Sequence, residues 1–121
     1  MKLKNILIVV NDIEVSKSFY KNLFGLQVTL DMGENVMMTE GLVLQERKLW
    51  ESFTGKSVVP GGHDFEVYFE ESNMDRFLEK LNAYEPKVQY VNPVEEFYGQ
   101  RVVRIYDPDM HVIEVKEVSY D

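Results

Sequence analysis

The order of the first structural elements follows from residues 3–30, which read LKNILIVVNDIEVSKSFYKNLFGLQVTL. Ile and Val dominate residues 3–10, which predicts a strand. Asn11 or Asp12 then offers a side-chain oxygen that can cap the start of a helix. That helix is indicated by apolar residues that recur at every fourth position and so share one face, namely Val15, Phe19 and Leu23.

Three strands are expected after this helix. Gly25 stands where a helix commonly ends on a left-handed residue, and Gly41 separates the last two strands. In the first of the three strands Leu26, Val28 and Leu30 alternate with polar residues, which is typical of a half-buried strand. The expected strands are 26–30, 36–39 and 42–46.

The same order of elements returns after Gly61 and Gly62. Apolar and polar residues alternate over residues 65–70, Ser72 can cap a second helix, and three further strands are expected at 88–91, 101–106 and 111–116. We interpret the chain as one domain, 1–121, made of module 1–47, connecting loop 48–62 and module 63–121. The connecting loop holds Trp50 and Phe53, which either form a lid or pack onto the core or onto a dimer partner.

Composition limits the classes of function. With 121 residues, of which 45% are hydrophobic, the chain can bury a core of its own. Its 21 acidic and 13 basic residues give a net charge of -8, which repels nucleic acids and anionic membrane surfaces. The absence of cysteine excludes disulfides and thiolate chemistry, and we expect a cytoplasmic protein without a signal peptide or membrane-spanning segment.

Two stretches of the sequence carry a family resemblance. Residues 9–12, VVND, run into SFY at 18–20 and LFGL at 23–26, and residues 106–114 read YDPDMHVIE. These stretches resemble the vicinal oxygen chelate superfamily, which includes glyoxalase I, bleomycin-resistance proteins, fosfomycin-resistance enzymes and extradiol dioxygenases. The resemblance implies an α+β fold of two βαβββ modules that form an open half-barrel cavity, usually completed by a homodimer. Relatives usually carry Gly where this sequence has Met110.

The resemblance also implies a set of site residues. In metal-using members four positions on the first and last strands of the two modules hold a divalent metal ion, which acts as a Lewis acid. Carried across, these positions are Asn5, Gln45, Glu66 and Glu114, and none of them is a histidine. A set of ligands with so few nitrogen donors favours Mg²⁺ or Mn²⁺ over Zn²⁺ or Ni²⁺. Strand alternation independently places Glu66 and Glu114 on polar faces.

Two glutamates on one face raise the question of their charge. Carboxylates about 5 Å apart repel by roughly 3 kcal/mol at an effective dielectric near 20. A metal ion, a cationic ligand group, a shared proton, Arg101 or Arg104, or exposure to solvent would each relieve this repulsion. Tyr68 shares the face of Glu66 and would add an aromatic wall and a hydroxyl group. His63 is a reserve ligand, whereas His111 has the wrong strand parity to lie beside Glu114.

These residues support three hypotheses for the function. The first is a lyase or isomerase for a small oxygenated substrate, with Glu66 and Glu114 as metal ligands or proton-transfer groups. The second is a protein without chemistry that sequesters a cationic compound, as in the bleomycin-resistance branch. The third is an interaction module whose cleft is filled by the segment around Trp50. In the first two, the ligand-binding residues are predicted to be Asn5, Gln45, Trp50, Tyr68 and Arg104.

Overall fold

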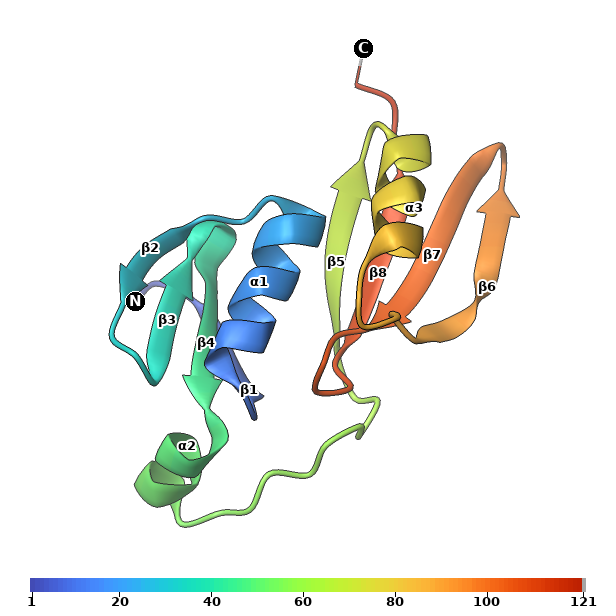
Figure 1. The fold of residues 1–121 in the computed structure, drawn as a ribbon. Helices are drawn as coiled ribbons and strands as arrows, with labels where there is room; N and C mark the ends of the chain where they lie inside the picture. The colour runs from blue at the N-terminus through green and yellow to red at the C-terminus, as the bar shows by residue number, and fades with distance from the viewer. Residues whose placement is uncertain (121) are drawn as a thin grey trace. The chain divides into compact units, whose positions relative to one another are not determined.

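The computed structural model describes residues 1–120 and divides into two compact units, Met1–Val59 and Pro60–Asp121. Each unit contains one four-stranded sheet and repeats the order strand, helix, three strands (Figure 1). The predicted fold class, two βαβββ modules with open sheets, is therefore confirmed.

The first unit has the sheet order β1-β4-β3-β2, with β1 and β4 parallel and the other neighbours antiparallel. The parallel pair is possible because a long connection, made of helix α1 and strands β2 and β3, joins β1 to β4. Its elements are β1 (Ile6–Val10), α1 (Ile13–Phe24), β2 (Val28–Asp31), β3 (Asn35–Met38), the 3₁₀ turn η1 (Thr39–Gly41), β4 (Leu42–Glu46) and α2 (Arg47–Thr54).

Helix α1 begins and ends at the predicted positions. Asp12, rather than Asn11, is its cap, and its Oδ1 accepts a hydrogen bond from Val15 N at 3.1 Å. Gly25 ends the helix with φ at 70°. Phe19 and Leu23 are buried as predicted, at 2% exposed each, but Val15 is 44% exposed and Tyr20 is fully buried in its place.

Strand β2 differs from its prediction. We expected Val28 and Leu30 to face the core, but they are 37% and 47% exposed, and every residue of β2 is exposed. The reason is position, since β2 is the edge of its sheet and pairs only with β3. The apolar alternation therefore identified a strand correctly but placed too much of it in the core.

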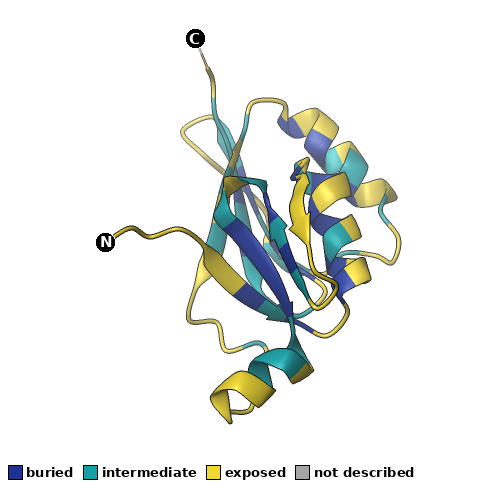
Figure 2. Cartoon of the chain, turned by 90° about the vertical axis from the view of Figure 1, so that its left-hand side faces the viewer, coloured by how far each residue is buried: buried dark blue, intermediate teal, exposed yellow. Residues whose placement is uncertain are grey.

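The expected connecting loop 48–62 begins as a helix. Helix α2 is supported by an ion pair between Arg47 and Glu51 at 3.3 Å, and Glu51 also accepts a hydrogen bond from Val58 N at 2.9 Å. Trp50 is half-buried in this helix and Phe53 is 71% exposed. Figure 2 shows the exposed C-terminal end of α2 in yellow. None of the helices among residues 1–120 is long and apolar enough to cross a membrane.

The second unit repeats the topology of the first, with the sheet order β5-β8-β7-β6 and a parallel β5–β8 pair. Asn73, rather than the predicted Ser72, caps its helix, and its Oδ1 accepts a hydrogen bond from Arg76 N at 3.1 Å. The elements are β5 (Glu66–Glu71), α3 (Met74–Ala83), β6 (Tyr90–Phe97), β7 (Gln100–Tyr106) and β8 (Val112–Glu117).

The two faces of the second sheet have different characters. Side chains that point toward α3 include Val103, Ile105, Ile113 and Val115, each at most 1% exposed. Because successive strand residues point to opposite faces, the even-numbered residues of β7 and β8 lie on the side away from α3, which we call the distal face. The core of this unit therefore fixes which side chains the distal face presents.

Candidate functional site

A polar row crosses the distal face of the second sheet. The strand register pairs Tyr68 of β5 with Glu114 of β8, Glu114 with Arg104 of β7, and Arg104 with Asn92 of β6. Directly opposed residues of neighbouring strands lie within side-chain reach of one another. The register thus brings together one residue from each strand, three of them charged or aromatic.

Arg104 neutralises Glu114. Its Nε donates to Glu114 Oε1 at 3.0 Å, its Nη2 lies 2.9 Å from the same oxygen, and its Nη1 donates to Glu95 Oε1 at 3.2 Å. The Glu114 side chain is only 15% exposed, so these charge-assisted bonds are shielded from solvent on one side. Arg101 and Arg104 have opposite strand parity in β7, and Arg104 is therefore the one that neutralises Glu114.

Arg101 acts on the other face of the same strand. Its guanidinium lies 2.8 Å from Glu117 of β8 and 2.7 Å from Asp75 of α3. The hydrogen bonds from the Arg101 side chain and backbone lower the pKa of Glu117 to about 2. Arg101 therefore ties α3 to the sheet and does not belong to the candidate site.

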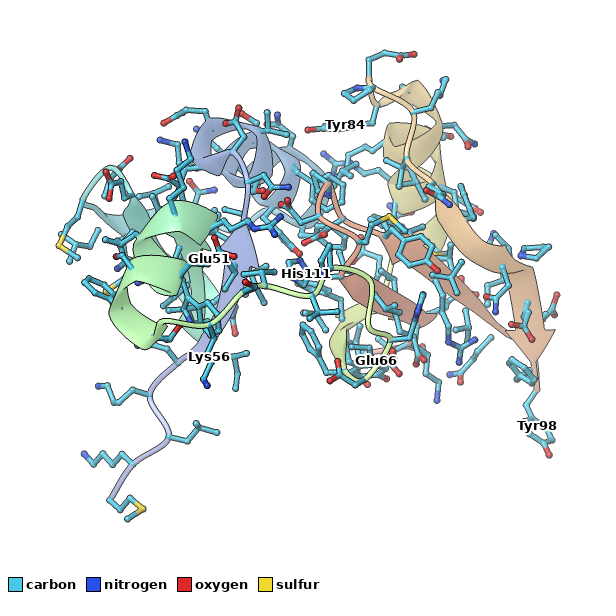
Figure 3. All side chains as sticks on the ribbon, turned by 90° about the horizontal axis from the view of Figure 1, so that it is seen from below. Glu51, Lys56, Glu66, Tyr84, Tyr98 and His111 are labelled. Atoms are coloured by element: carbon cyan, nitrogen blue, oxygen red, sulfur yellow. The ribbon has the colours of Figure 1, made fainter. Side chains whose placement is uncertain are left out.

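Glu66 and Glu114 form a coupled carboxyl pair. Glu66, which is labelled in Figure 3, begins strand β5. It pairs in register with Val112, so it lies diagonally from Glu114 on the adjacent strand. Partial desolvation raises the pKa of Glu66, and the charge of Glu114 and a hydrogen bond to it raise this pKa further. Glu66 remains an exposed residue, so solvent moderates the shift. The positive charge of Arg104 acts in the opposite direction and relieves part of the repulsion between the two carboxyl groups.

Tyr68 borders this pair. Its hydroxyl group donates to Glu70 Oε2 at 3.0 Å, and the residue is 48% exposed. Desolvation, followed by the hydrogen bond to Glu70, raises the pKa of Tyr68. The ring is thus held beside Glu114 as a partly exposed aromatic surface.

The residues predicted in the first unit are not brought together. Gln45 is 9% exposed, and its Nε2 donates to Asn35 Oδ1 at 3.0 Å. Asn5 precedes β1 and lies beside Gly41, because a Cβ at Gly41 would be 3.9 Å from Asn5 Cα. Gly41 and Gln45 are four residues apart, or about 13 Å along a strand. Asn5 and Gln45 therefore sit at opposite ends of β4, and Trp50 lies beyond both, in α2.

Within the second unit, the carboxylates are not a free set of ligands for a divalent metal ion. No three His, Cys, Asp or Glu residues within 1–120 are grouped so as to hold one. Glu114 is already bonded to a guanidinium, and the amide of Gln45 is bonded to Asn35. Hard cations need several oxygen ligands, and within the second unit Glu95 and Glu114 already share the Arg104 guanidinium. The chemistry that these residues support is ion pairing and proton exchange.

Sequence reasoning missed part of the distal face. Tyr106, which shares a register row with Val112 and Glu66, is hydrogen-bonded through its hydroxyl group to His63 Nε2 at 2.7 Å. His63 has φ at 56°, and this backbone turn after Gly62 brings its ring to Tyr106. The only sign of this contact in the sequence analysis was the prediction that His63 could serve as a reserve ligand.

Other polar groups were also missed or lie elsewhere. Asn92 Oδ1 is buried without a hydrogen-bond partner among the described residues. Glu95 escaped notice because its strand was predicted to end at residue 91, whereas β6 continues to Phe97. His111 lies away from this row, with its Nδ1 at 2.8 Å from Asp107 Oδ2 and its ring 5.7 Å from that of Phe65.

Comparisons with known proteins agree with this architecture. A family model described as a glyoxalase-like domain matches residues 3–119. No curated protein matches the chain significantly. Among solved structures, a protein of unknown function from Agrobacterium tumefaciens is 36% identical with a TM-score of 0.80, and the match covers 98% of this chain and 94% of that one.

Two more distant structures share the fold. A lactoylglutathione lyase from Agrobacterium tumefaciens is 20% identical with a TM-score of 0.72, over 96% of this chain and 92% of that one. The fosfomycin resistance protein FosX from Listeria monocytogenes is 17% identical with a TM-score of 0.73, over 98% and 94% of the two chains. At these identities the likeness concerns the fold and not the activity.

Proposed function

The chain belongs to the glyoxalase-like domain family, and on this premise we propose that it binds a small molecule with a cationic group on the distal face of its second unit. The observation that carries the proposal is the imbalance of charge around Glu114. Glu95 and Glu114 are both paired with the one guanidinium of Arg104, and Glu66 adds a third carboxyl group beside Glu114 that has no ion-pair partner of its own among the described residues. An ammonium or guanidinium group of a ligand would complete the neutralisation.

The proposed contact has a defined chemistry. A ligand cation beside Glu66 favours the ionised carboxylate, so binding would lower the raised pKa of Glu66. The partly exposed ring of Tyr68 offers the cation a second attractive surface. Binding is therefore expected to release a proton to solvent, and the net charge of -8 attracts cations from a distance.

A second candidate function rests on the same pair. The raised pKa of Glu66 brings this group closer to neutral pH, which suits a residue that gives and takes protons during a lyase or isomerase reaction. Tyr106, fixed by His63, places a hydroxyl group in the same register row. Sequestration of a cationic compound has the stronger support, because it directly explains the excess of negative charge around Glu114. The homodimer implied by the family resemblance stays a prediction.

Isothermal titration with metal-free bleomycin, used as a cationic probe, tests the proposal. We expect binding by the wild type, with proton release seen as a heat that depends on the ionisation enthalpy of the buffer. Glu66→Gln should bind at least tenfold more weakly, because the charge that meets the cation is lost (about 1.4 kcal/mol per tenfold change).

A matched control separates the site from general acidity. Glu96→Gln removes the same charge from the opposite face of the sheet, where Glu96 pairs with Arg101 in register, and should leave the affinity unchanged. Equal weakening by both variants, or no binding by the wild type, would contradict the proposal.

A further inference from the structure

The clearest disagreement between the family pattern and this chain is the position of the Arg104 guanidinium. It lies where a cation would bridge Glu114 and Glu95, at 2.9 Å and 3.2 Å from one oxygen of each. We propose that Arg104 is a built-in counter-ion that takes the electrostatic place of a metal ion and closes the distal face to divalent cations.

The geometry supports this role in two ways. The planar guanidinium uses three of its nitrogens on these two carboxylates, and a hydrated metal ion cannot share the same oxygens without displacing it. Arg104 is also fixed by its place in the row, because the β7–β8 register holds it directly opposite Glu114. Because this counter-ion is a side chain of β7, it cannot dissociate into solvent as a bound metal ion can.

Removing the guanidinium should allow a divalent cation to bind on the distal face. Without Arg104, the carboxylates of Glu95 and Glu114 would lose the cation that they share, and their oxygens would be open to a hard divalent ion such as Mn²⁺, with water completing its coordination. Arg101 offers a matched comparison, since it also bridges two carboxylates, Glu117 and Asp75, but on the α3 side of the same strand.

The experiment is a titration of metal-free protein with MnCl₂, followed by melting temperature and by calorimetry. We expect 1 mM Mn²⁺ to leave the wild type and Arg104→Lys unchanged, and to stabilise Arg104→Gln by several degrees with at least tenfold tighter binding than the wild type. The gain should disappear in Arg104→Gln/Glu114→Gln and should not occur in Arg101→Gln.

Two results would overturn the proposal. One is a folded Arg104→Gln protein that binds Mn²⁺ no better than the wild type. The other is wild-type protein that binds Mn²⁺ in a manner abolished by Glu114→Gln, a measurement that stands even if Arg104→Gln does not fold. The proposal uses carboxylates of the proposed ligand site, but metal titration alone tests it, so failure of bleomycin binding would not affect this outcome.

Discussion

Replacing Glu117 by Gln should lower the stability of the protein in a pH-dependent way. Glu117 accepts hydrogen bonds from the Arg101 backbone and side chain, and its pKa falls from the ordinary 4.5 to about 2. A gap of about 2.5 pKa units corresponds to at most about 3.5 kcal/mol, since each pKa unit is worth about 1.4 kcal/mol. The two side chains are 23% and 31% exposed, so solvent screening reduces the expected effect to about 1–2 kcal/mol.

The sign of the pH dependence follows from the lowered pKa. The carboxylate stabilises the folded state fully above its unfolded pKa of 4.5, and this contribution is lost as the pH falls toward about 2. Urea unfolding followed by far-UV circular dichroism should therefore show the largest difference between wild type and Glu117→Gln near neutral pH. The difference should shrink progressively below about pH 4.5.

Glu79→Gln, on the exposed side of α3, serves as the control for loss of one charge. A difference for Glu117→Gln that is no larger than that of the control, or one that is constant with pH, would refute the reasoning. It would also place the Arg101 bridge between α3 and the sheet in doubt.

Three further changes test other parts of the second unit, each by urea unfolding. For Glu66→Gln, the raised pKa means that the wild type loses stability as the pH rises from the ordinary 4.5 through the raised pKa of Glu66. The variant should therefore gain stability relative to the wild type over that range, and a parallel pH dependence of the two proteins would count against the carboxyl pair. Asp107→Ala should lower the free energy of unfolding by about 2–4 kcal/mol, because this fully buried carboxylate accepts hydrogen bonds from the backbone N–H groups of Asp109 and His111. A loss of less than about 1 kcal/mol would show that the turn does not depend on Asp107. Met110→Gly should stabilise the protein by about 0.5–1 kcal/mol, because Met110 has φ at 69°, and destabilisation would contradict the left-handed turn.

Local signals explain why much of the fold could be predicted. The α1 cap at Asp12 and the stop at Gly25 depend on residues within one turn of the helix, so the sequence contains them directly. Alternation in β5 and β8 depends only on the strand period, and it placed Glu66 and Glu114 on the face where the structure has them. These features need no knowledge of distant contacts.

What escaped prediction depends on pairing between distant segments. Strand β6 contains Pro93 and shifts register twice against β7, so only its pairing reveals its length. The parity of Arg101 and Arg104 was evident, but choosing between them required the register of β7 against β8. Likewise, the distance of Asn5 from Gln45 follows from the β1–β4 register and from no local pattern.

The most direct test is a carbon-13 NMR titration of the Glu66 side-chain carboxyl group in the wild type and in Glu114→Gln. We predict that Glu66 titrates above the ordinary 4.5 in the wild type and that its pKa falls partway back in the variant, where desolvation remains but the neighbouring charge is gone. An ordinary pKa in the wild type, or one that Glu114→Gln does not change, would show that the two carboxyl groups do not meet.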